Sequence, residues 1–203
     1  MARACAAIVC AFFLAAGAVS AAPQGGAIAR RASGLVGHHS LREVVRGFSD
    51  DCSGLVRYVY SRSGIELLPP GVEARGGASA AIHHRLQRLG ALRRRAARPG
   101  DLVFFHDTYD RNRDGRRNDG VTHVGIVESV AQGGQVTFVH RTRAGIVRSR
   151  LDLRQPLLQR DRAGRVHNDV LRRASRGQRA FNAGELFAGF ATPPRRVPKR
   201  PAA

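Results

Sequence analysis

The spacing of apolar residues changes at Pro99, and this change limits the folds that the chain can adopt. Before Pro99 the clearest apolar set, Leu55, Val56, Val59 and Tyr60, recurs at the spacing of a buried helix face. After Pro99 the apolar residues come in short runs bounded by turn residues, which is typical of strands. A helical part followed by antiparallel strands indicates an α+β fold around one core.

One helix is predicted clearly and two more weakly. The clear helix can be capped by Asp50 or Asp51 and ends near Gly64. Weaker helical patterns cover residues 41–46 and 82–95. The expected strands cover residues 102–105, 122–128, 135–140, 146–151, 170–171 and 186–190.

The N-terminal residues have the features of a secretory signal peptide. Arg3 supplies positive charge, and residues 6–19 are almost wholly apolar before a set of small residues. We therefore expect residues 1–21 to be a signal peptide, with an uncleaved anchor as the alternative. The apolar run is short for crossing a bilayer, so no transmembrane segment is predicted and the protein is expected to be secreted or periplasmic.

Three segments follow the expected signal peptide. Residues 22–34 are rich in Ala, Gly and Ser, which predicts a flexible linker. Residues 35–192 are long enough for one domain with its own core. Residues 193–203 are rich in Pro and Arg, which predicts a disordered tail.

The chain is strongly basic, with a formal net charge of +19 at pH 7, and Lys199 is its only lysine. A basic surface attracts anionic partners such as wall polymers, lipids or nucleic acid. Nucleic acid is not an expected partner, because the sequence has no recognition motif and no aromatic series for stacking on bases. The net charge therefore affects how the protein meets anionic partners and how soluble it is, but it does not indicate which reaction the protein catalyses.

Cys52 is the only cysteine that remains once the expected signal peptide is removed. Exported proteins usually pair their cysteines, because a lone thiol is exposed to oxidation. A lone thiol at the start of a helix is better explained as a nucleophile, since the helix N-terminus favours the thiolate. The alternative is a small buried residue with no chemical role.

Two histidines are candidates for a base and its partner. His123 opens the strand over residues 122–128, and Gly125 leaves space beside it on the same face. His140 ends the next expected strand, and an antiparallel hairpin brings that end back beside His123. We therefore expect His123 to take the thiol proton and His140 to orient His123. A structural histidine is the alternative for each.

Four motifs occur in a recognisable order and cover most of residues 48–140. They are DCSGLV at residues 51–56, PGDLVFF at 99–105, HVGIV at 123–127 and FVH at 138–140. This ordered set resembles the NlpC-type cysteine peptidases, papain-like enzymes that cut the peptide stems of bacterial murein. CHAP amidases, which also use Cys and His, are related.

This resemblance implies a papain-like α+β fold, with the nucleophile helix packed on an antiparallel sheet. It implies a Cys52 nucleophile, a His123 base and His140 as the third residue, with Asp51 and Ser53 as substrate contacts. The implied substrate is peptidoglycan, cleaved at an amide bond by a monomer. No metal or organic cofactor is required for such a reaction.

The chain also departs from the family pattern. Family members usually carry a tyrosine and a Gly-Gly pair upstream of the cysteine, where this chain has residues 46–49, Arg-Gly-Phe-Ser. This departure keeps open a second hypothesis, a non-catalytic or calcium-dependent module that binds the cell wall.

A polar loop lies between the second and third motifs. Asp110, Asn112 and Asp114 alternate there and Gly115 follows, which is the opening pattern of a calcium loop. The backbone carbonyl of Arg116 and the side chain of Asn118 or Asp119 would complete the ligand set. The EF-hand glutamate is absent, and a polar insertion with Asx turns is the alternative. If calcium binds, its expected role is to fix the loop that leads into His123.

Overall fold

The computed structural model describes residues 24–69, 76–175 and 177–194. In the described residues, three α-helices and one 3₁₀ helix precede all of the strands: α1 (Gln24–Ser33), the 3₁₀ helix at Leu41–Glu43, α2 (Cys52–Ser61) and α3 (Ala78–Arg88). The strands are β1 (Leu92–Arg93), β2 (Leu102–His106), β3 (Val121–Val130), β4 (Val136–Thr142), β5 (Gly145–Leu151), β6 (Val170–Arg172), β7 (Phe181–Asn182) and β8 (Phe187–Ala191).

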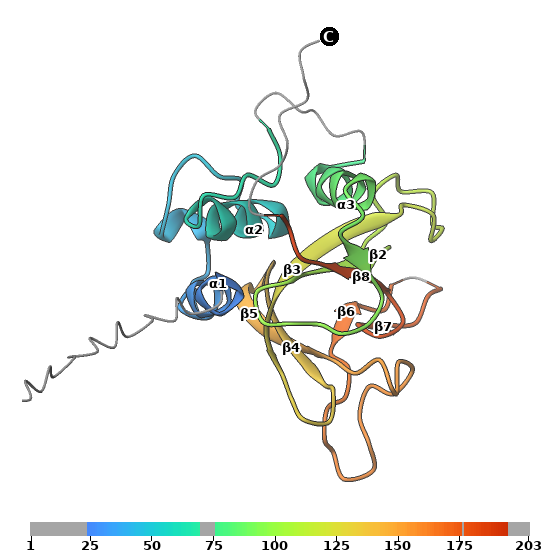
Figure 1. The fold of residues 1–203 in the computed structure, drawn as a ribbon. Coiled ribbons are helices and arrows are strands. Elements are labelled where there is room, and N and C mark those ends of the chain that lie inside the picture. The colour runs from blue at the N-terminus through green and yellow to red at the C-terminus, as the bar shows by residue number, and fades with distance from the viewer. Residues whose placement is uncertain (1–23, 70–75, 176, 195–203) are drawn as a thin grey trace, which may run out of the picture.

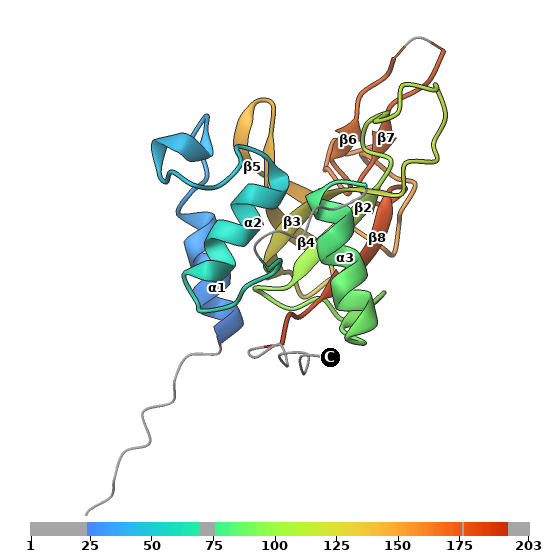
Figure 2. The same ribbon diagram turned by 90° about the horizontal axis from the view of Figure 1, so that it is seen from above.

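Six of the strands form one antiparallel sheet in the order β1-β8-β2-β3-β4-β5, while β6 and β7 pair separately. The three α-helices lie on one side of this sheet, where each contacts β3, and β6 and β7 lie on the other side (Figures 1 and 2). The predicted α+β arrangement, a nucleophile helix on an antiparallel sheet, is therefore confirmed.

The sheet is buried on both faces by two apolar clusters. Alternate residues of a strand point to opposite faces. In β2, Leu102 and Phe104 accordingly join the cluster beneath the helices, while Val103 and Phe105 join the second cluster. Burial on both faces explains why β2 is a continuous apolar run in the sequence rather than an alternating one.

Helix α2 begins where its capping residue predicts. The Asp51 carboxylate accepts a hydrogen bond from the backbone N–H of Gly54 at 2.8 Å, which satisfies one of the unpaired donors of the first turn. Gly54 allows this turn to pack against the preceding segment, because a Cβ there would lie 1.8 Å from the carbonyl oxygen of Ser49. Cap and glycine together fix where Cys52 lies.

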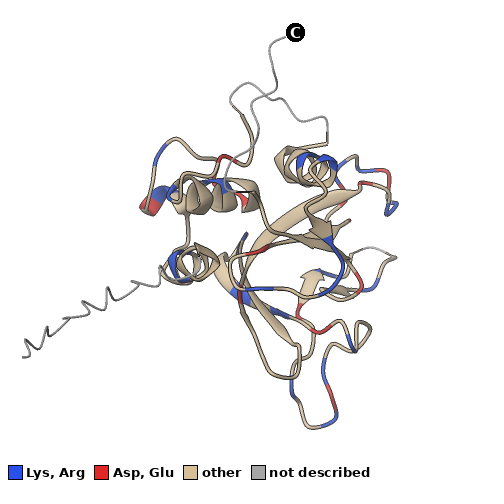
Figure 3. Ribbon diagram, viewed as in Figure 1, with Lys and Arg blue, Asp and Glu red and all other residues tan. Residues whose placement is uncertain are grey.

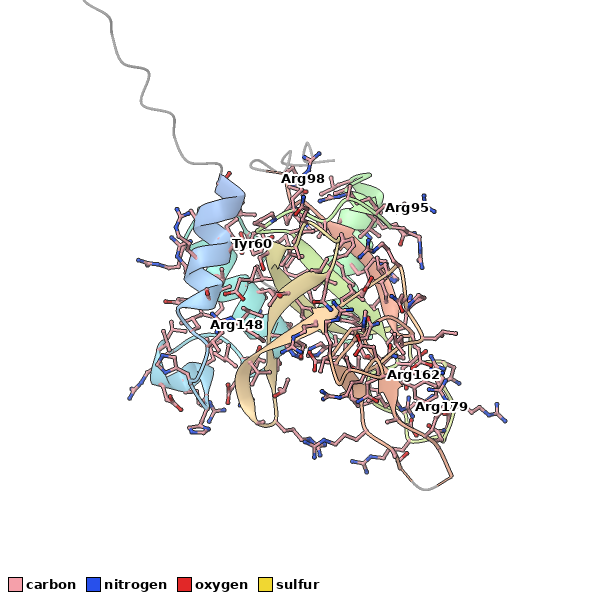
Figure 4. The ribbon with its side chains drawn as sticks, turned by 90° about the horizontal axis from the view of Figure 1, so that it is seen from below. Tyr60, Arg95, Arg98, Arg148, Arg162 and Arg179 are labelled. Atoms are coloured by element: carbon pink, nitrogen blue, oxygen red, sulfur yellow. The ribbon has the colours of Figure 1, made fainter. Side chains whose placement is uncertain are left out.

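The other end of α2 is anchored in the interior by Tyr60. This side chain, labelled in Figure 4, is fully buried, and its hydroxyl donates a hydrogen bond to the carbonyl of Gly100. Gly100 belongs to the Pro-Gly-Asp turn that precedes β2. Helix α2 is thus tied directly to the start of the sheet.

The prediction of a flexible linker over residues 22–34 is wrong for residues 24–33, which form α1. The side chains of Ile28, Ala29 and Ala32 recur at helical spacing and are buried. Arg148, in β5, donates to the hydroxyl of Ser33 in α1 at 2.7 Å, and Figure 4 shows Arg148 near this helix. Small side chains let α1 approach the sheet closely, so the composition reflects packing rather than flexibility.

Other differences are smaller. The helix expected over residues 82–95 spans 78–88, and Leu92–Arg93 form β1 instead. Strand β7 was not expected. The predicted signal peptide, residues 1–21, and residues 195–203 of the predicted tail lie outside the described residues. No helix in the described ranges is long and apolar enough to cross a membrane.

Candidate active site

Cys52 is the first residue of α2 and lies at the edge of the helix-covered core. Its side chain is partly buried and forms no disulfide. The sulfur lies 3.4 Å from the hydroxyl of Ser79, in the first turn of α3. Two helix starts therefore meet at the thiol.

The two candidate histidines are in direct contact. His123 Nε2 lies 2.8 Å from His140 Nδ1, and the rings meet edge to face. His140 is buried, and its other nitrogen, Nε2, lies 3.0 Å from the hydroxyl of Ser149 in β5. The hairpin prediction that brought His140 beside His123 is confirmed by this contact.

The register of β3 and β4 explains the contact. Ile126 pairs with Val139, and continuing this register by one residue sets Gly125 opposite His140. A Cβ at Gly125 would lie 3.3 Å from the Cβ of His140 and 3.0 Å from the carbonyl oxygen of Val139, so a larger residue would push the strands apart. His123 is two residues from Gly125 on the same face, which places it diagonally across from His140.

The surroundings of Cys52 favour its thiolate. Burial raises the pKa of the thiol, but the charge of His123 and a hydrogen bond from it outweigh burial, with help from Ser79 and the backbone of Val124. The net pKa of Cys52 is lowered. A thiolate beside an imidazolium is the reactive form of a cysteine nucleophile.

His140 is held in its neutral form. Burial, with the charge of His123 as the second cause, moves the pKa of His140 well below its usual value. A protonated His123 donates from Nε2, so a neutral His140 must accept at Nδ1 and carry its own proton on Nε2. That proton points to the Ser149 oxygen, and His123 Nδ1 is the nitrogen left for Cys52.

The thiol and the imidazoles open into one cleft of 1040 Å³. Its walls come from the starts of α2 and α3, the loop after β2, the β4–β5 turn and the end of β6. The predicted site residues Cys52, His123, His140, Asp51 and Ser53 all line it, together with Ser79.

A comparison with family models shows the family of the chain. The model described as NlpC/P60 family matches residues 38–162, more than half of the chain. The chain belongs to the NlpC/P60 family. Members of this family are generally cell-wall peptidases that act on peptidoglycan. Comparison with curated proteins found no match, and neither did comparison with solved structures.

The two predicted substrate contacts of this NlpC/P60 domain differ in their availability. Asp51 is exposed, and its Oδ1 accepts hydrogen bonds from the N–H of Gly54 and, at 2.6 Å, from the Ser53 hydroxyl. Ser53 is buried and its hydroxyl is engaged by Asp51. Asp51 can therefore meet a substrate directly, whereas Ser53 acts by fixing the Asp51 carboxylate.

Three residues at the site were not predicted. Ser149 occupies a buried, inward position of β5, and a polar residue at such a position is a signal that alternation in the sequence could have revealed. Ser79 and Tyr109 carry no comparable signal. Tyr109 lines the cleft, and burial, followed by the charge of Cys52, raises the pKa of its phenol.

The Asp114 side chain, in the loop of residues 107–119, is held by bonds to near neighbours, while the loop backbone also accepts hydrogen bonds from the distant side chains of Arg172 and Gln178. The Asp114 carboxylate accepts hydrogen bonds from the side-chain amides of Asn112 at 3.0 Å and Asn118 at 2.8 Å. It also accepts from the backbone N–H of Arg116 at 2.8 Å. These are Asx-type contacts of a polar turn, and they bring most of the predicted calcium ligands together.

Two of the predicted calcium ligands, Asp110 and Asp119, differ in whether their carboxylate oxygens are already hydrogen-bonded. Asp110 Oδ1 is buried and has no hydrogen-bond partner in the described ranges, and hard oxygen donors of this kind suit calcium. The Asp119 carboxylate is instead bonded to the backbone N–H of Arg111 at 3.0 Å. Within the part of the chain that the structure describes, no three His, Cys, Asp or Glu side chains are grouped to hold a metal ion. Calcium binding by this loop stays a prediction.

Proposed function

We propose that this protein is a cysteine hydrolase that cleaves an amide bond in the peptide stems of peptidoglycan. Cys52 is the nucleophile, His123 the base, and His140 the residue that orients it. The observation that carries the proposal is the contact of His123 with the buried His140 at 2.8 Å, in one cleft with Cys52, whose thiol pKa is lowered by the charge of His123. A histidine pair with only a structural role would not require a neighbouring thiol whose pKa is lowered.

The reaction follows from the positions of the protons. The Cys52 thiolate attacks the carbonyl carbon of the scissile amide and forms a carbon–sulfur bond. His123 gives its proton to the leaving amine as the carbon–nitrogen bond breaks. Water then attacks the thioester, His123 takes a proton from that water, and the stem is released as a carboxylic acid with Cys52 restored.

The start of α2 supplies charge stabilisation for the intermediate. The first N–H groups of a helix have no partner within the helix. In the described residues the N–H of Cys52 has no acceptor, since the Asp51 side chain takes the N–H of Gly54 instead. This N–H is therefore the donor that we assign to the oxyanion.

Ser149 contributes through His140 rather than through the substrate. As the acceptor for His140 Nε2–H, it keeps His140 Nδ1 free to accept from His123. The other tautomer of His140 would present a donor to His123 Nε2, which would leave the proton of a neutral His123 on Nδ1, facing the thiol. The base would then be blocked.

The location of the substrate fits the expected export of the chain. Murein lies outside the cytoplasmic membrane, so a protein that acts on it must be secreted or periplasmic. The signal-peptide pattern in residues 1–21 supports this part of the proposal. Neither metal nor organic cofactor is required for the steps above.

The test is digestion of murein fragments by the purified protein, with mass spectrometry of the products. We expect cleavage within the stem by the wild type and none by Cys52→Ala or His123→Ala. Ser61→Ala, on the same helix but outside the cleft, and His84→Ala, on an exposed helix face, are the matched controls and should cleave normally.

One observation favours a second candidate, a binding module without catalysis. Residues 46–49 stand where the family usually has a tyrosine and a Gly-Gly pair, and the aromatic residue in this segment, Phe48, packs edge-on against Tyr58 and supplies no hydroxyl. Murein fragments that bind the wild type and Cys52→Ala equally, and stay intact with both, would support this alternative. Binding lost on calcium removal would support its calcium-dependent form.

A further inference from the structure

We propose that Arg143 and Arg173 form a carboxylate-binding subsite in the cleft beside Cys52. The subsite receives an acidic group of the bound peptide and so selects stems that carry a free carboxylate. This proposal rests on the proposed function, because it names the substrate chemistry of the same cleft.

Four arginines line the cleft, and two of them are already engaged. Arg141 forms a two-pronged ion pair with Asp50, at 2.8 and 2.9 Å. Arg172 is buried and donates to the carbonyl of Asp107 and to the side chain of Gln178, both at 2.9 Å. These two guanidinium groups hold the walls together and are not available to a ligand.

Arg143 and Arg173 are different. Both side chains are exposed at the cleft, and neither has a hydrogen bond or ion pair with any residue in the described ranges. Arg143 lies in the turn between β4 and β5, and Arg173 follows β6, which belongs to the separate two-stranded sheet. Two unrelated elements therefore bring an unneutralised positive charge to one cleft.

The cleft is also polarised. Its exposed carboxylate, Asp51, lies next to the nucleophile, whereas the carboxylate of Asp50 is neutralised by Arg141. Asp110 faces the cleft from the loop after β2, and its Oδ2 accepts from the N–H of Gly115 at 2.9 Å. A ligand thus meets acidic side chains at the start of α2 and in the loop after β2, and basic side chains at the β4–β5 turn and the end of β6.

A guanidinium group is a planar fork of donors that matches a carboxylate in charge and geometry. A murein stem offers this chemistry at an acidic residue within the chain and at its free C-terminus. Either carboxylate would be drawn to Arg143 and Arg173, and the contact would fix the direction in which the peptide lies across Cys52.

Arginine is spread over the whole molecule, as Figure 3 shows, so a matched control is required. Arg95 and Arg162 are exposed, lie outside the cleft, and are seen at the outside of the molecule in Figure 4. The double variant Arg95→Gln/Arg162→Gln removes the same total charge as Arg143→Gln/Arg173→Gln. A comparison of the two separates a local subsite from the general field of a basic protein.

The experiment measures binding of synthetic stem peptides to the full chain carrying Cys52→Ala, so that no cleavage intervenes. Three peptides are used: one with all carboxylates free, one amidated at the internal acidic residue, and one amidated at the C-terminus. We expect Arg143→Gln/Arg173→Gln to weaken binding of the free acid at least about tenfold, the scale of a lost charge-assisted contact. The control double variant should bind as the parent does.

The amidated peptides identify the carboxylate. Amidation of the group that the subsite holds should weaken binding to the parent by a similar factor and should have no further effect on binding to Arg143→Gln/Arg173→Gln.

Equal losses of binding in both double variants, or full binding by Arg143→Gln/Arg173→Gln, would overturn the proposed subsite. Because binding is read without catalysis, that result leaves the proposed hydrolase untouched, while a wild type that binds but never cleaves would refute the hydrolase alone.

Discussion

Two regions of the molecule gather polar side chains, and their hydrogen bonds differ in how far apart in the sequence the bonded residues lie. The row of Cys52, His123, His140 and Ser149 joins residues that lie 17 and 9 positions apart in sequence at its histidine contacts. In the loop of residues 107–119 the Asp114 carboxylate is bonded to residues only 2 and 4 positions away. Long-range contacts hold a catalytic geometry because the core sets them, whereas local contacts need only a turn.

The pKa shifts in the two regions have different causes. The pKa of His140 is lowered by burial and by the charge of His123. The pKa of Asp114 is also lowered, but chiefly by a hydrogen bond from Asn118, and its side chain is exposed. A pKa shift caused by burial indicates a site that is shielded from water. A pKa shift caused by hydrogen bonds between neighbouring surface residues does not.

The largest effect is expected at the thiol. Cys52→Ala should lower kcat by about 10⁴-fold or more, since loss of a nucleophile removes the covalent route. Asp114→Ala, in the loop, should change kcat less than about twofold, because surface substitutions of this kind have small effects. Mass spectrometry of murein digests measures both. A loop variant as inactive as Cys52→Ala would erase the distinction between the two regions.

The next effect concerns stability and its pH dependence. Asp50 bonds to Arg141 across 91 residues, and this contact lowers the pKa of Asp50 well below its usual range. Because the folded-state pKa is lowered, the stability gained is present above the ordinary Asp pKa of about 4 and is lost as pH falls below it. Asp50→Asn should lower the free energy of unfolding by about 2 kcal/mol at pH 7.

Urea unfolding at pH 7 and pH 3 measures this effect. The difference between Asp50→Asn and the wild type should shrink at the lower pH, while Asp114→Asn should show little difference at either pH. A difference that grows on acidification would contradict the assigned ion pair.

Ser149→Ala should lower kcat about tenfold with little change in KM, because the lost hydrogen bond of about 1 kcal/mol acts only through the tautomer of His140. Ser149→Thr keeps the hydroxyl and should recover most of the rate. The pH profile should also change in Ser149→Ala and not in Ser149→Thr. A matching loss of rate in both variants would point to packing instead.

The smallest effect is expected from calcium. Extracellular sites of modest affinity bind with a Kd of about 10⁻⁴ to 10⁻³ M. At tenfold excess over Kd, calcium would stabilise the folded protein by about 1.4 kcal/mol and raise Tm by about 3–6 °C. Thermal melts of the wild type should show this rise and those of Asp114→Asn should not. An equal rise in Tm for both proteins, or no rise for either, would contradict calcium binding by the loop and would support a polar turn without a metal.

Much of the helix–sheet core could be predicted, because its signals are local. Asp51 caps α2 as its side chain predicts, and β2 to β5 follow the apolar runs. The contact of His123 with His140 follows from hairpin geometry together with Gly125. In each case the residue type and its neighbours in the chain carry the information.

The remaining features depend on contacts between distant segments. Helix α1 was not predicted because its small residues, which allow close packing on the sheet, are also typical of a flexible linker. Ser79 reaches Cys52 only because α3 folds back onto α2. The free charges of Arg143 and Arg173 become visible only once the partners of Arg141 and Arg172 are known.

The most direct test of the account is the pH dependence of iodoacetamide alkylation at Cys52, followed by peptide mass spectrometry. The account predicts a midpoint below the free-cysteine value of about 8.5 in the wild type, and a higher midpoint in His123→Ala, where only Ser79 and the backbone of Val124 oppose the effect of burial. A wild-type midpoint at or above the free value, unchanged by His123→Ala, would contradict the thiolate–imidazolium pair on which the proposed function depends.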